Sequence, residues 1–547
     1  MSRAADPNES KTADPNESRT ADPSPIDPRE EEPLDFAKLM IVFSVMLAAI
    51  LEIIDTSIVN VALPDMMGNL GATIDEIGWV VTGYIISNVI IIPMTSWLSS
   101  RFGRKRYLTS SILLFTAASA LCGTARSLEE LVLFRVIQGL GGGALLATAQ
   151  AVMIETFPPS QQGVGQAIFG VGAMLGPSLG PTLGGWITDD FSWPWIFYVN
   201  VPLGLLAAAL CATYLEDPEH MRGRKDLRVD YPGIALLVVG VGALQTVLER
   251  GHRLDWFESG FVTGLAVVAA LAIVLFVVRE LSTDEPVVDL RLLRTPSLAV
   301  GCTLGVLMGV GLYGSIYLFP LFSQSLLGWS AWDSGLAILP SSIATAITMG
   351  IVGRLVWRLG PRPIFLFGML VFLGSLAGMM RWTHLSGWDD VFWPQVGRGI
   401  AMGAMFVPLS TATLRTLRPQ DVTQGAGLYN LFRQLGGSFG IAVLGTLIDR
   451  QGRVHRAYLS EHLSPLDPLT RERAGSLQAF FGAHGLDPTS ALDAAHRTLS
   501  HLLDVQSLSL AFEDAYRFIG MACVLTLPLI YFLGRGAPVP LGAQGSR

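Results

Sequence analysis

Two carboxylates, Glu52 and Asp55, stand inside the first long apolar segment of the chain, at residues 36–64. A helix of this length crosses a hydrocarbon core of roughly 30 Å, and a charge near its centre costs about 2.5–3.5 kcal/mol on the most lenient scale. The two acids would share one helical face with Thr56 and Asn60, because residues three and four positions apart lie on the same side. Acidic groups at membrane depth indicate a functional site.

The chemistry that two such acids support is the uptake and release of protons. Their side chains should lie roughly 5–6 Å apart, and both burial and mutual repulsion then favour the protonated form. We therefore predict that Glu52 and Asp55 titrate as a coupled pair that links proton movement to transport. The alternative is a structural ion pair with an arginine on a neighbouring helix.

The composition predicts an all-α polytopic membrane protein that positions these acids. Half of the 547 residues are hydrophobic and only 15% are charged, against about 25% in soluble domains. The apolar runs are continuous rather than alternating, which excludes a barrel. Four cysteines lie in apolar segments and indicate neither a disulfide framework nor a metal site, and a net charge of −8 gives no indication of nucleic acid.

Fourteen apolar segments are expected to cross the membrane. They lie at residues 37–64, 76–99, 106–124, 129–151, 162–187, 195–215, 230–249, 257–279, 296–322, 332–356, 362–381, 391–414, 424–448 and 512–534. Arginine and lysine concentrate in the short loops on one side, for example at 101–106 and 222–228. The positive-inside rule then places both termini in the cytoplasm.

An internal repeat divides the chain into two halves. Residues 96–106 resemble 353–363, and residues 135–144 resemble 395–404 at nearly the same offset. Duplicated halves of this kind enclose a midplane cavity and rock against each other. The predicted regions are a disordered cytoplasmic tail (1–35), a six-helix bundle (36–215), two inserted transmembrane helices (216–295), a second six-helix bundle (296–535) with an outer insertion (450–511), and a cytoplasmic tail (536–547).

The segment at 162–187 carries a dense run of helix-shaping residues. They are Gly172, Gly176, Pro177, Gly180, Pro181 and Gly184. Glycines repeating every four residues form a flat groove for close helix packing. Each proline removes a backbone donor and is expected to kink the helix.

The segment at 129–151 contains Arg135 and Gln138 among several glycines. A buried guanidinium needs a carboxylate or several acceptors nearby. The glycines at 139, 142 and 143 are expected to let neighbouring helices approach.

These stretches together resemble the major facilitator superfamily, and more narrowly its fourteen-helix drug:proton antiporter branch, typified by EmrB and QacA. Residues 53–64, IIDTSIVNVALP, are similar to the first-helix motif of the branch, and residues 172–181 are similar to its antiporter motif. The resemblance implies export driven by proton entry, with alternating access of the two halves. It also implies that Asp55 carries the proton and that Arg135, on a neighbouring helix, couples to it. A purely structural pair remains the alternative for Arg135.

The loop after the second segment departs from the superfamily pattern. Serines occupy positions 96 and 100, where the family usually has glycine and aspartate. The family residues that remain are Arg101, Gly103, Arg104 and Lys105. Without the aspartate we expect no charge relay here, and the arginines would act only as topology signals.

A substrate cavity is expected from polar residues at membrane depth in both halves. They are Thr56, Asn60, Gln138, Gln324, Arg398, Asn430 and Arg433. The second half has no carboxylate at membrane depth, so proton binding should be confined to the first. Packing of Gln324 at the outer end of its helix, and helix-to-helix hydrogen bonding by Asn430 and Arg433, are the alternatives.

The insertion at 450–511 has helical periodicity, and its histidines lack a compact ligand spacing. Its length and position resemble EmrB-type proteins of two-membrane bacteria. That resemblance implies location in the inner membrane, an EmrA-like periplasmic adaptor and an outer-membrane channel as partners. A self-packed cap is the competing interpretation.

The predicted function is proton-coupled efflux of amphipathic drugs or toxic organic compounds, with no cofactor. A dedicated exporter or importer of a single metabolite on the same scaffold is the alternative. A polytopic enzyme or sensor would need a catalytic constellation or a soluble output domain, and neither is evident. The chain has no phosphate-binding glycine–lysine motif, which argues against ATP as the direct energy source.

Overall fold

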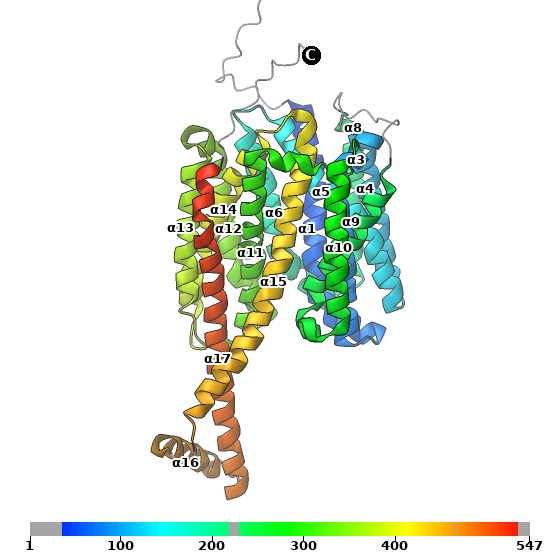
Figure 1. Ribbon diagram of the computed structural model, residues 1–547. Helices are drawn as coiled ribbons and strands as arrows, with labels where there is room; N and C mark the ends of the chain where they lie inside the picture. The colour runs from blue at the N-terminus through cyan, green and yellow to red at the C-terminus, as the bar shows by residue number, and fades with distance from the viewer. Residues whose placement is uncertain (1–34, 218–228, 465–466, 534–547) are drawn as a thin grey trace, which may run out of the picture.

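The computed structural model describes residues 35–217, 229–464 and 467–533. The two predicted tails, apart from Asp35, and the loop at 218–228 lie outside these residues. The described chain is a bundle of long helices that run roughly antiparallel to one another (Figure 1).

The first helix group contains residues up to Tyr214. Its helices are α1 (Phe36–Leu70), α2 (Ile74–Ile77), α3 (Trp79–Phe102), α4 (Arg104–Thr124), α5 (Leu128–Thr156), α6 (Gln162–Asp190), α7 (Trp195–Tyr198) and α8 (Asn200–Tyr214). The ends of α1 follow local chemistry: Asp35 accepts a hydrogen bond from the N–H of Phe36 at 2.7 Å, and Gly71 ends the helix in the left-handed conformation, φ 64°. Only glycine adopts that conformation without steric cost.

The second helix group begins at Pro296. Its helices are α11 (Pro296–Ser325), α12 (Ala331–Leu359), α13 (Pro361–Met379), α14 (Trp388–Leu414), α15 (Val422–Glu461), α16 (Pro468–Ala483) and α17 (Pro488–Thr526). Between the two groups lie α9 (Tyr231–Arg250), the short 3₁₀ turns η2 (His252–Leu254) and η3 (Trp256–Glu258), and α10 (Gly260–Ser282).

Twelve spans among the described residues are long and apolar enough to cross a membrane. Every predicted segment coincides with a helix, but α6 and α14 are not among these twelve. Polar residues lower the mean hydropathy of α14, whereas the side chains of several residues within α6 lie outside the described part of the chain, so that no continuous stretch of α6 long enough to span a membrane is fully described. The predicted count of fourteen crossings therefore remains a prediction.

The helix contacts repeat between the two groups. In the first group α1 packs against α5, α6 and α8, and in the second α11 packs against α14, α15 and α17. The groups meet along two seams, α6 on α12 and α3 on α15. The pairing of α6 with α1 and of α15 with α11 is the arrangement expected of the duplicated sequence.

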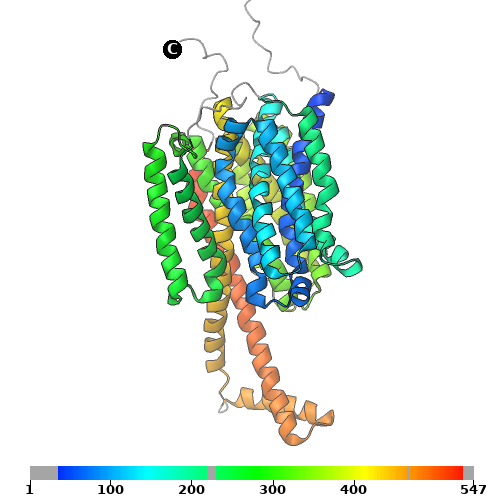
Figure 2. The same cartoon turned by 90° about the vertical axis from the view of Figure 1, so that its right-hand side faces the viewer.

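The inserted pair α9–α10 stands beside the bundle, seen in green in Figure 2. Although it is peripheral, it contacts both groups. The guanidinium of Arg250 lies 4.5 Å from the ring centroid of Trp79 in α3, whereas Gln245 Nε2 donates to Ser438 Oγ of α15 at 2.7 Å. The pair therefore bridges α3 and α15.

The insertion is helical, as its periodicity predicts, but it is continuous with the helices of the bundle. Helix α15 continues without a break to Glu461 and α17 begins at Pro488, so both helices project beyond the bundle (Figure 1). Ion pairs join the two extensions, with Arg456 Nε 2.5 Å from Asp504 Oδ1. We call the face from which they project the insertion face, and the opposite one, where α1 begins, the tail face.

Candidate functional site

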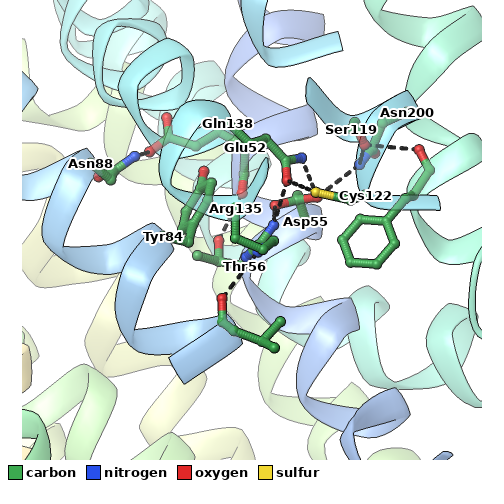
Figure 3. Close-up of polar contacts among 12 residues, drawn as sticks. Glu52, Asp55, Thr56, Tyr84, Asn88, Ser119, Cys122, Arg135, Gln138 and Asn200 are labelled. Carbon is green, nitrogen blue, oxygen red and sulfur yellow. Dashed lines mark hydrogen bonds and ion pairs between the residues drawn. The ribbon is translucent and has the colours of Figure 1, made fainter. Parts of the chain in front are cut away.

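Asp55 lies at the centre of a buried polar cluster (Figure 3). Arg135 Nη1 of α5 lies 2.5 Å from its Oδ2. The side-chain amides of Gln138, also on α5, and of Asn200 on α8 each donate to Oδ1 at 2.8 Å. A buried carboxylate with one ion pair and two amide donors has the partners that its charge requires.

Arg135 is as deeply buried as Asp55, with only 1% of its surface exposed. Its Nη1 also donates to Gln138 Oε1 at 2.7 Å, and its Nε donates to the carbonyl of Val80 at 3.2 Å. The guanidinium carbon lies 4.1 Å from the ring centroid of Tyr84, a favourable cation–π distance. The helices α1, α3 and α5 together therefore fix the position of this charge.

Glu52 occupies a separate position one turn earlier on α1. Asn88 Nδ2 of α3 donates to Oε1 at 2.9 Å, and the backbone N–H of Leu146 donates to Oε2 at 3.1 Å. Arg433 of α15 is close enough to interact with it electrostatically. Glu52 and Asp55 share the predicted face, but their oxygens bind different partners, so coupled titration of the two remains a prediction.

The structural ion pair proposed as the alternative for Asp55 is present in this conformation. The predicted proximity of the first and fourth apolar segments is also observed, because α1 and α5 supply its two members. An ion pair in one conformation is compatible with proton coupling, provided that the pair opens in another.

The glycine run of α6 packs directly against α1. A Cβ atom added at Gly176 would lie 2.3 Å from Ile53 Cγ2, and one added at Gly180 would lie 1.9 Å from Ser57 Oγ. Cβ atoms added at Gly172 and Gly184 would also lie within contact distance of residues of α1. The side chains of Pro177 and Pro181 lie outside the described part of the chain, so the predicted kink remains a prediction.

The glycines of α5 allow a similar approach to α3. A Cβ at Gly139 would lie 2.5 Å from the carbonyl oxygen of Tyr84, and one at Gly143 would lie 2.6 Å from that of Asn88. This close packing brings Tyr84 against Arg135 and Asn88 against Glu52.

The prediction that the loop arginines act only as topology signals is wrong for Arg104. It is 2% exposed and forms a bidentate pair with Glu155 of α5, at 2.5 and 2.9 Å. Its Nη2 also donates to Thr423 Oγ1 of α15 at 3.1 Å, which connects the two helix groups at the tail face. Glu155 supplies the acid that the motif lacks at Ser100.

The other residues of this loop motif have local contacts. The guanidinium of Arg101 lies 5.7 Å from the ring centroid of Trp97. Gly103 has φ 86°, a conformation that favours glycine. The backbone N–H of Lys105 donates to Asp217 Oδ1 at 2.7 Å.

A second polar network crosses the seam between the groups. Asn430 Nδ2 of α15 donates to Gln150 Oε1 of α5 at 2.6 Å, and Arg433 Nη2 donates to Asn430 Oδ1 at 3.0 Å. Gln434 Nε2 lies 3.4 Å from Asn88 Oδ1. Asn430 thus forms a helix-to-helix hydrogen bond, as its alternative interpretation expected, whereas the bond from Arg433 lies within α15.

Four residues of the predicted cavity do not join either network. The Thr56 hydroxyl donates to the carbonyl of Glu52 in its own helix at 2.7 Å. Asn60 is exposed and donates to the carbonyl of Thr56 at 3.2 Å. Gln324 is exposed near the end of α11. Arg398 is buried in α14, with Nη1 3.4 Å from Ser315 Oγ.

Sequence reasoning missed several members of the site. Asn88, Gln150 and Asn200 each complete a buried contact to a predicted residue. Their signal was a single amide inside an otherwise apolar segment, which also occurs at ordinary helix contacts.

Apolar helices that enclose buried, paired charges define a multi-pass membrane protein, and two similar helix groups are typical of a secondary transporter. The family model for the Major Facilitator Superfamily matches residues 45–441. The multidrug export protein EmrB of Escherichia coli (strain K12) is 33% identical over 519 residues, covering 94% of this chain and 98% of that protein. The chain belongs to the major facilitator superfamily.

Two further relatives bear on fold and function. The fatty acid resistance protein FarB of Neisseria gonorrhoeae is 34% identical over 492 residues, covering 90% of this chain and 95% of that protein. The structure of the proton:xylose symporter XylE is similar with a TM-score of 0.57 at 14% identity, covering 91% and 96% of the two chains. The structural similarity supports the fold alone.

Proposed function

We propose that this protein exports amphipathic organic compounds across a bacterial inner membrane in exchange for protons. The observation that carries the proposal is the buried pair of Asp55, near the middle of α1, and Arg135, in the first third of α5. The similarity to the multidrug export protein EmrB supports export as the direction and drug-like compounds as the substrates.

Proton binding to Asp55 supplies the switch in this proposal. Protonation removes the charge that holds Arg135 at 2.5 Å, and the guanidinium keeps Gln138 Oε1 and the Val80 carbonyl as acceptors. Since α1 carries Asp55 and packs on α6, loss of the pair alters the position of α1 within its group. Loss of the proton to the cytoplasm restores the pair.

Glu52 connects the same helix to the second group. Its carboxylate accepts a hydrogen bond from the side-chain amide of Asn88. The side-chain oxygen Oδ1 of the same Asn88 accepts from Gln434 Nε2 of α15 at 3.4 Å. Protonation of Glu52 weakens its bond to Asn88, because a neutral carboxyl is a poorer acceptor than a carboxylate. Protonation of Glu52 therefore weakens the contacts between α3 and α15, along the seam where the two helix groups separate.

The conformation described is closed at the tail face, which we assign to the cytoplasm. The Arg104–Thr423 bond and the close approach of Gly163 to Gly353 join the two groups there. In this proposal the six-helix bundles separate at that face to admit substrate, and at the insertion face to release it. The termini then lie in the cytoplasm, as the distribution of arginines and lysines predicts.

The helical insertion is proposed as the contact site for a periplasmic adaptor and, through it, an outer-membrane channel. It projects beyond the bundle and exposes large apolar side chains, among them Leu469 and Phe480. The resemblance to EmrB-type proteins supports this partnership.

Uptake into inverted membrane vesicles tests the proposal directly. Vesicles energised with an inward-acid proton gradient are expected to accumulate lipophilic compounds from a panel of anionic, neutral and cationic members. Addition of a protonophore should abolish that accumulation. Accumulation that persists after addition of the protonophore would contradict proton coupling. Transport of only one compound of the panel would favour a dedicated exporter.

A further inference from the structure

A groove runs along the outer surface of the second helix group, between α12 and α13. Its volume is about 550 Å³, within the range of roughly 300–1,000 Å³ that is typical of ligand sites. Residues 344–359 of α12 and 363–367 of α13 form its walls, and Ile400 of α14 also lines it. The lining side chains are apolar except for the hydroxyl of Thr348. We call this feature the α12–α13 groove.

The α12–α13 groove faces away from the bundle, and so toward the hydrocarbon of the membrane. The side chains of Ile347, Ile351 and Phe367 are each more than half exposed. The other side of α12 packs on α6, where a Cβ atom added at Gly163 would lie 2.5 Å from the carbonyl oxygen of Gly353. The groove extends about 22 Å along α12, which exceeds the ~15 Å half-thickness of a hydrocarbon core. One acyl chain of a lipid in the leaflet on the tail side therefore fits along it.

Three arginines lie where the groove reaches the tail face. Arg354 and Arg358 follow Ile347 and Ile351 at spacings of four, three and four residues, so all four side chains share one face of α12. Both arginines are exposed. Arg362 is the second residue of α13, which begins after a single glycine. Long arginine side chains near helix ends reach the head-group level of a membrane while their stems cover apolar surface.

These three arginines have no acidic partner within the described residues. Arg354 Nη1 donates to the carbonyl of Gly350 at 3.2 Å, and Arg362 Nε donates to that of Leu533 at 2.6 Å. None of the ion pairs formed by the described residues includes any of the three. Residues 334–388 contain no aspartate or glutamate. The end of the groove therefore carries three positive charges that the described chain leaves without an acid.

The first helix group differs at the corresponding loop, because it supplies an acid. The loop that begins α4 resembles the loop that begins α13 in sequence. In the first of these, Arg104 pairs with Glu155 of α5. In the second helix group, the internal repeat aligns Arg415 of α14 with Glu155. The repeat thus has an acid in one half and a further cation in the other, which indicates that the anionic partner of the second loop comes from outside the chain.

We propose that an anionic phospholipid of the leaflet on the tail side binds here, with its phosphate among Arg354, Arg358 and Arg362 and one acyl chain along the α12–α13 groove. The guanidinium fork donates paired hydrogen bonds to phosphate oxygens, and clusters of basic residues beside transmembrane helices attract anionic head groups. The inference goes beyond the proposed function and requires only that the chain spans a membrane. The competing interpretation is that these arginines act solely as topology signals.

Photolabelling of the purified full-length protein tests the inference at the site itself. The probe is phosphatidylglycerol with a diazirine in one acyl chain, and the comparison is phosphatidylcholine with the same chains, both in a non-ionic detergent. Peptide mapping should place a saturable adduct within residues 344–367, at a roughly 10-fold lower concentration of phosphatidylglycerol than of phosphatidylcholine. Arg354→Gln/Arg358→Gln should lose most of that preference, because each arginine near an anionic lipid contributes about 5-fold. Labelling by phosphatidylcholine should not change.

Further variants separate lipid recognition from folding. Arg354→Lys/Arg358→Lys keeps both charges and should retain most of the preference. Arg381→Gln is the matched control, because Arg381 is exposed just beyond the opposite end of α13; it should be labelled like the wild type. Ile351→Trp fills part of the groove and should reduce labelling by both lipids, whereas Leu275→Trp, at a comparably exposed position of α10, should not.

Three results would overturn the inference. They are the absence of a saturable adduct within residues 344–367, equal labelling by the two lipids in the wild type, and unchanged labelling by phosphatidylglycerol in Arg354→Gln/Arg358→Gln. Glycerol phosphate, which lacks acyl chains, should not compete with the probe at the same concentration. Competition by it would assign the arginines to a free phosphate ion and would likewise overturn the lipid site. Since none of these measurements uses transport, their failure leaves proton-coupled export standing.

Discussion

At the scale of single residues, the site depends on the pairing of Asp55 with Arg135 in the buried interior of the first helix group. Each of the two side chains is at most 1% exposed to solvent. Removing one member of a buried pair leaves the other charge uncompensated, which typically costs about 3–5 kcal/mol. Removing both charges avoids that penalty. This asymmetry gives a stability test that is independent of transport.

We expect Asp55→Asn to lower the free energy of unfolding by roughly 3–5 kcal/mol, because it strands the Arg135 charge. The double variant Asp55→Asn/Arg135→Gln should recover most of that loss. Denaturant unfolding of the purified protein provides the measurement, with Asp65→Asn, at an exposed position near the end of α1, as the control. A double variant less stable than the single one would show that the two residues are not energetically coupled.

Sequence alone predicts the charged members of this site but not their pairing. Glu52, Asp55 and Arg135 are conspicuous because each interrupts an apolar segment. Which acid faces the arginine depends on the rotation of α1 against α5, and that is set by the packing of many apolar side chains. Asn200 is a single amide near the start of α8, and its contact with Asp55 is evident only in three dimensions.

At the scale of elements, the contact between α6 and α1 determines where the acids lie. The glycines of α6 allow the two backbones to approach, and the Ser57 hydroxyl lies 3.2 Å from the Gly176 carbonyl. The four-residue spacing predicted this groove correctly. It could not predict that α1 is the partner, because any helix with small or flexible side chains satisfies the same pattern.

Gly180→Ala should destabilise the protein by about 1–3 kcal/mol, the usual cost of overpacking, and should reduce transport. Its Cβ would lie 1.9 Å from Ser57 Oγ and 3.0 Å from the Ile58 backbone nitrogen. Gly185→Ala in the same helix is the matched control, since the nearest atom there is 3.9 Å away. Thermal unfolding and vesicle uptake of both variants provide the test, and equal behaviour of the two would refute the role of the groove.

We expect the N-terminal cap of α17, in the insertion, to depend on pH. Asp487 caps α17, and hydrogen bonds from Ser490 and Thr489 lower its pKa from 3.8 to about 2. A carboxyl whose pKa is lowered by folding stabilises the fold above its unfolded value, so this contribution is present above about pH 3.8 and is lost as the pH falls through 2.

Asp487→Ala should therefore speed hydrogen exchange of the backbone amides at residues 489–492 at neutral pH. The difference from the wild type should vanish near pH 2, where the wild-type carboxyl is itself protonated. Asp493→Ala, at an exposed position in the same helix, serves as the control and should have little effect at either pH. A variant effect that persists undiminished at pH 2 would contradict a charge-dependent cap.

At the scale of the whole molecule, the two helix groups meet at the tail face around a groove of about 190 Å³. Ser160 and Gly163 line it from the first group, and Trp357, Thr411 and Arg415 line it from the second. Because Arg104 also reaches Thr423 across the same face, the conformation described closes the path from that side. Alternating access requires this groove to open.

A cross-link across the groove should stop transport. The double variant Ser160→Cys/Trp357→Cys, treated with a short bis-methanethiosulfonate that joins the two thiols through disulfides, is expected to lose uptake in vesicles and to regain it after reduction of those disulfides. The four native cysteines are buried, and the two single variants treated in the same way are the controls. Full uptake by the cross-linked protein would show that the two groups do not separate at this face.

The sequence predicts much of this large-scale arrangement, because the internal repeat and the fourteen apolar segments specify two similar helix groups. It predicts less of the insertion, where α15 and α17 continue far beyond their apolar portions. Polar helical residues continue a helix into water with no apolar segment to mark them, so the sequence predicts helices within the insertion but not their continuity with the membrane helices. The bridging of α3 and α15 by α9 likewise depends on a few specific contacts, such as Gln245 to Ser438.

Proton release upon substrate binding measures the central element of the account most directly. A saturating amount of the tightest-binding panel compound is added to the purified protein in weakly buffered detergent solution, and the pH change is recorded for the wild type and for Asp55→Asn. The account predicts release of protons by the wild type and clearly less release by the folded variant, which retains only Glu52. Undiminished release by Asp55→Asn would show that the proton is carried elsewhere and would contradict the proposed role of the Asp55–Arg135 pair.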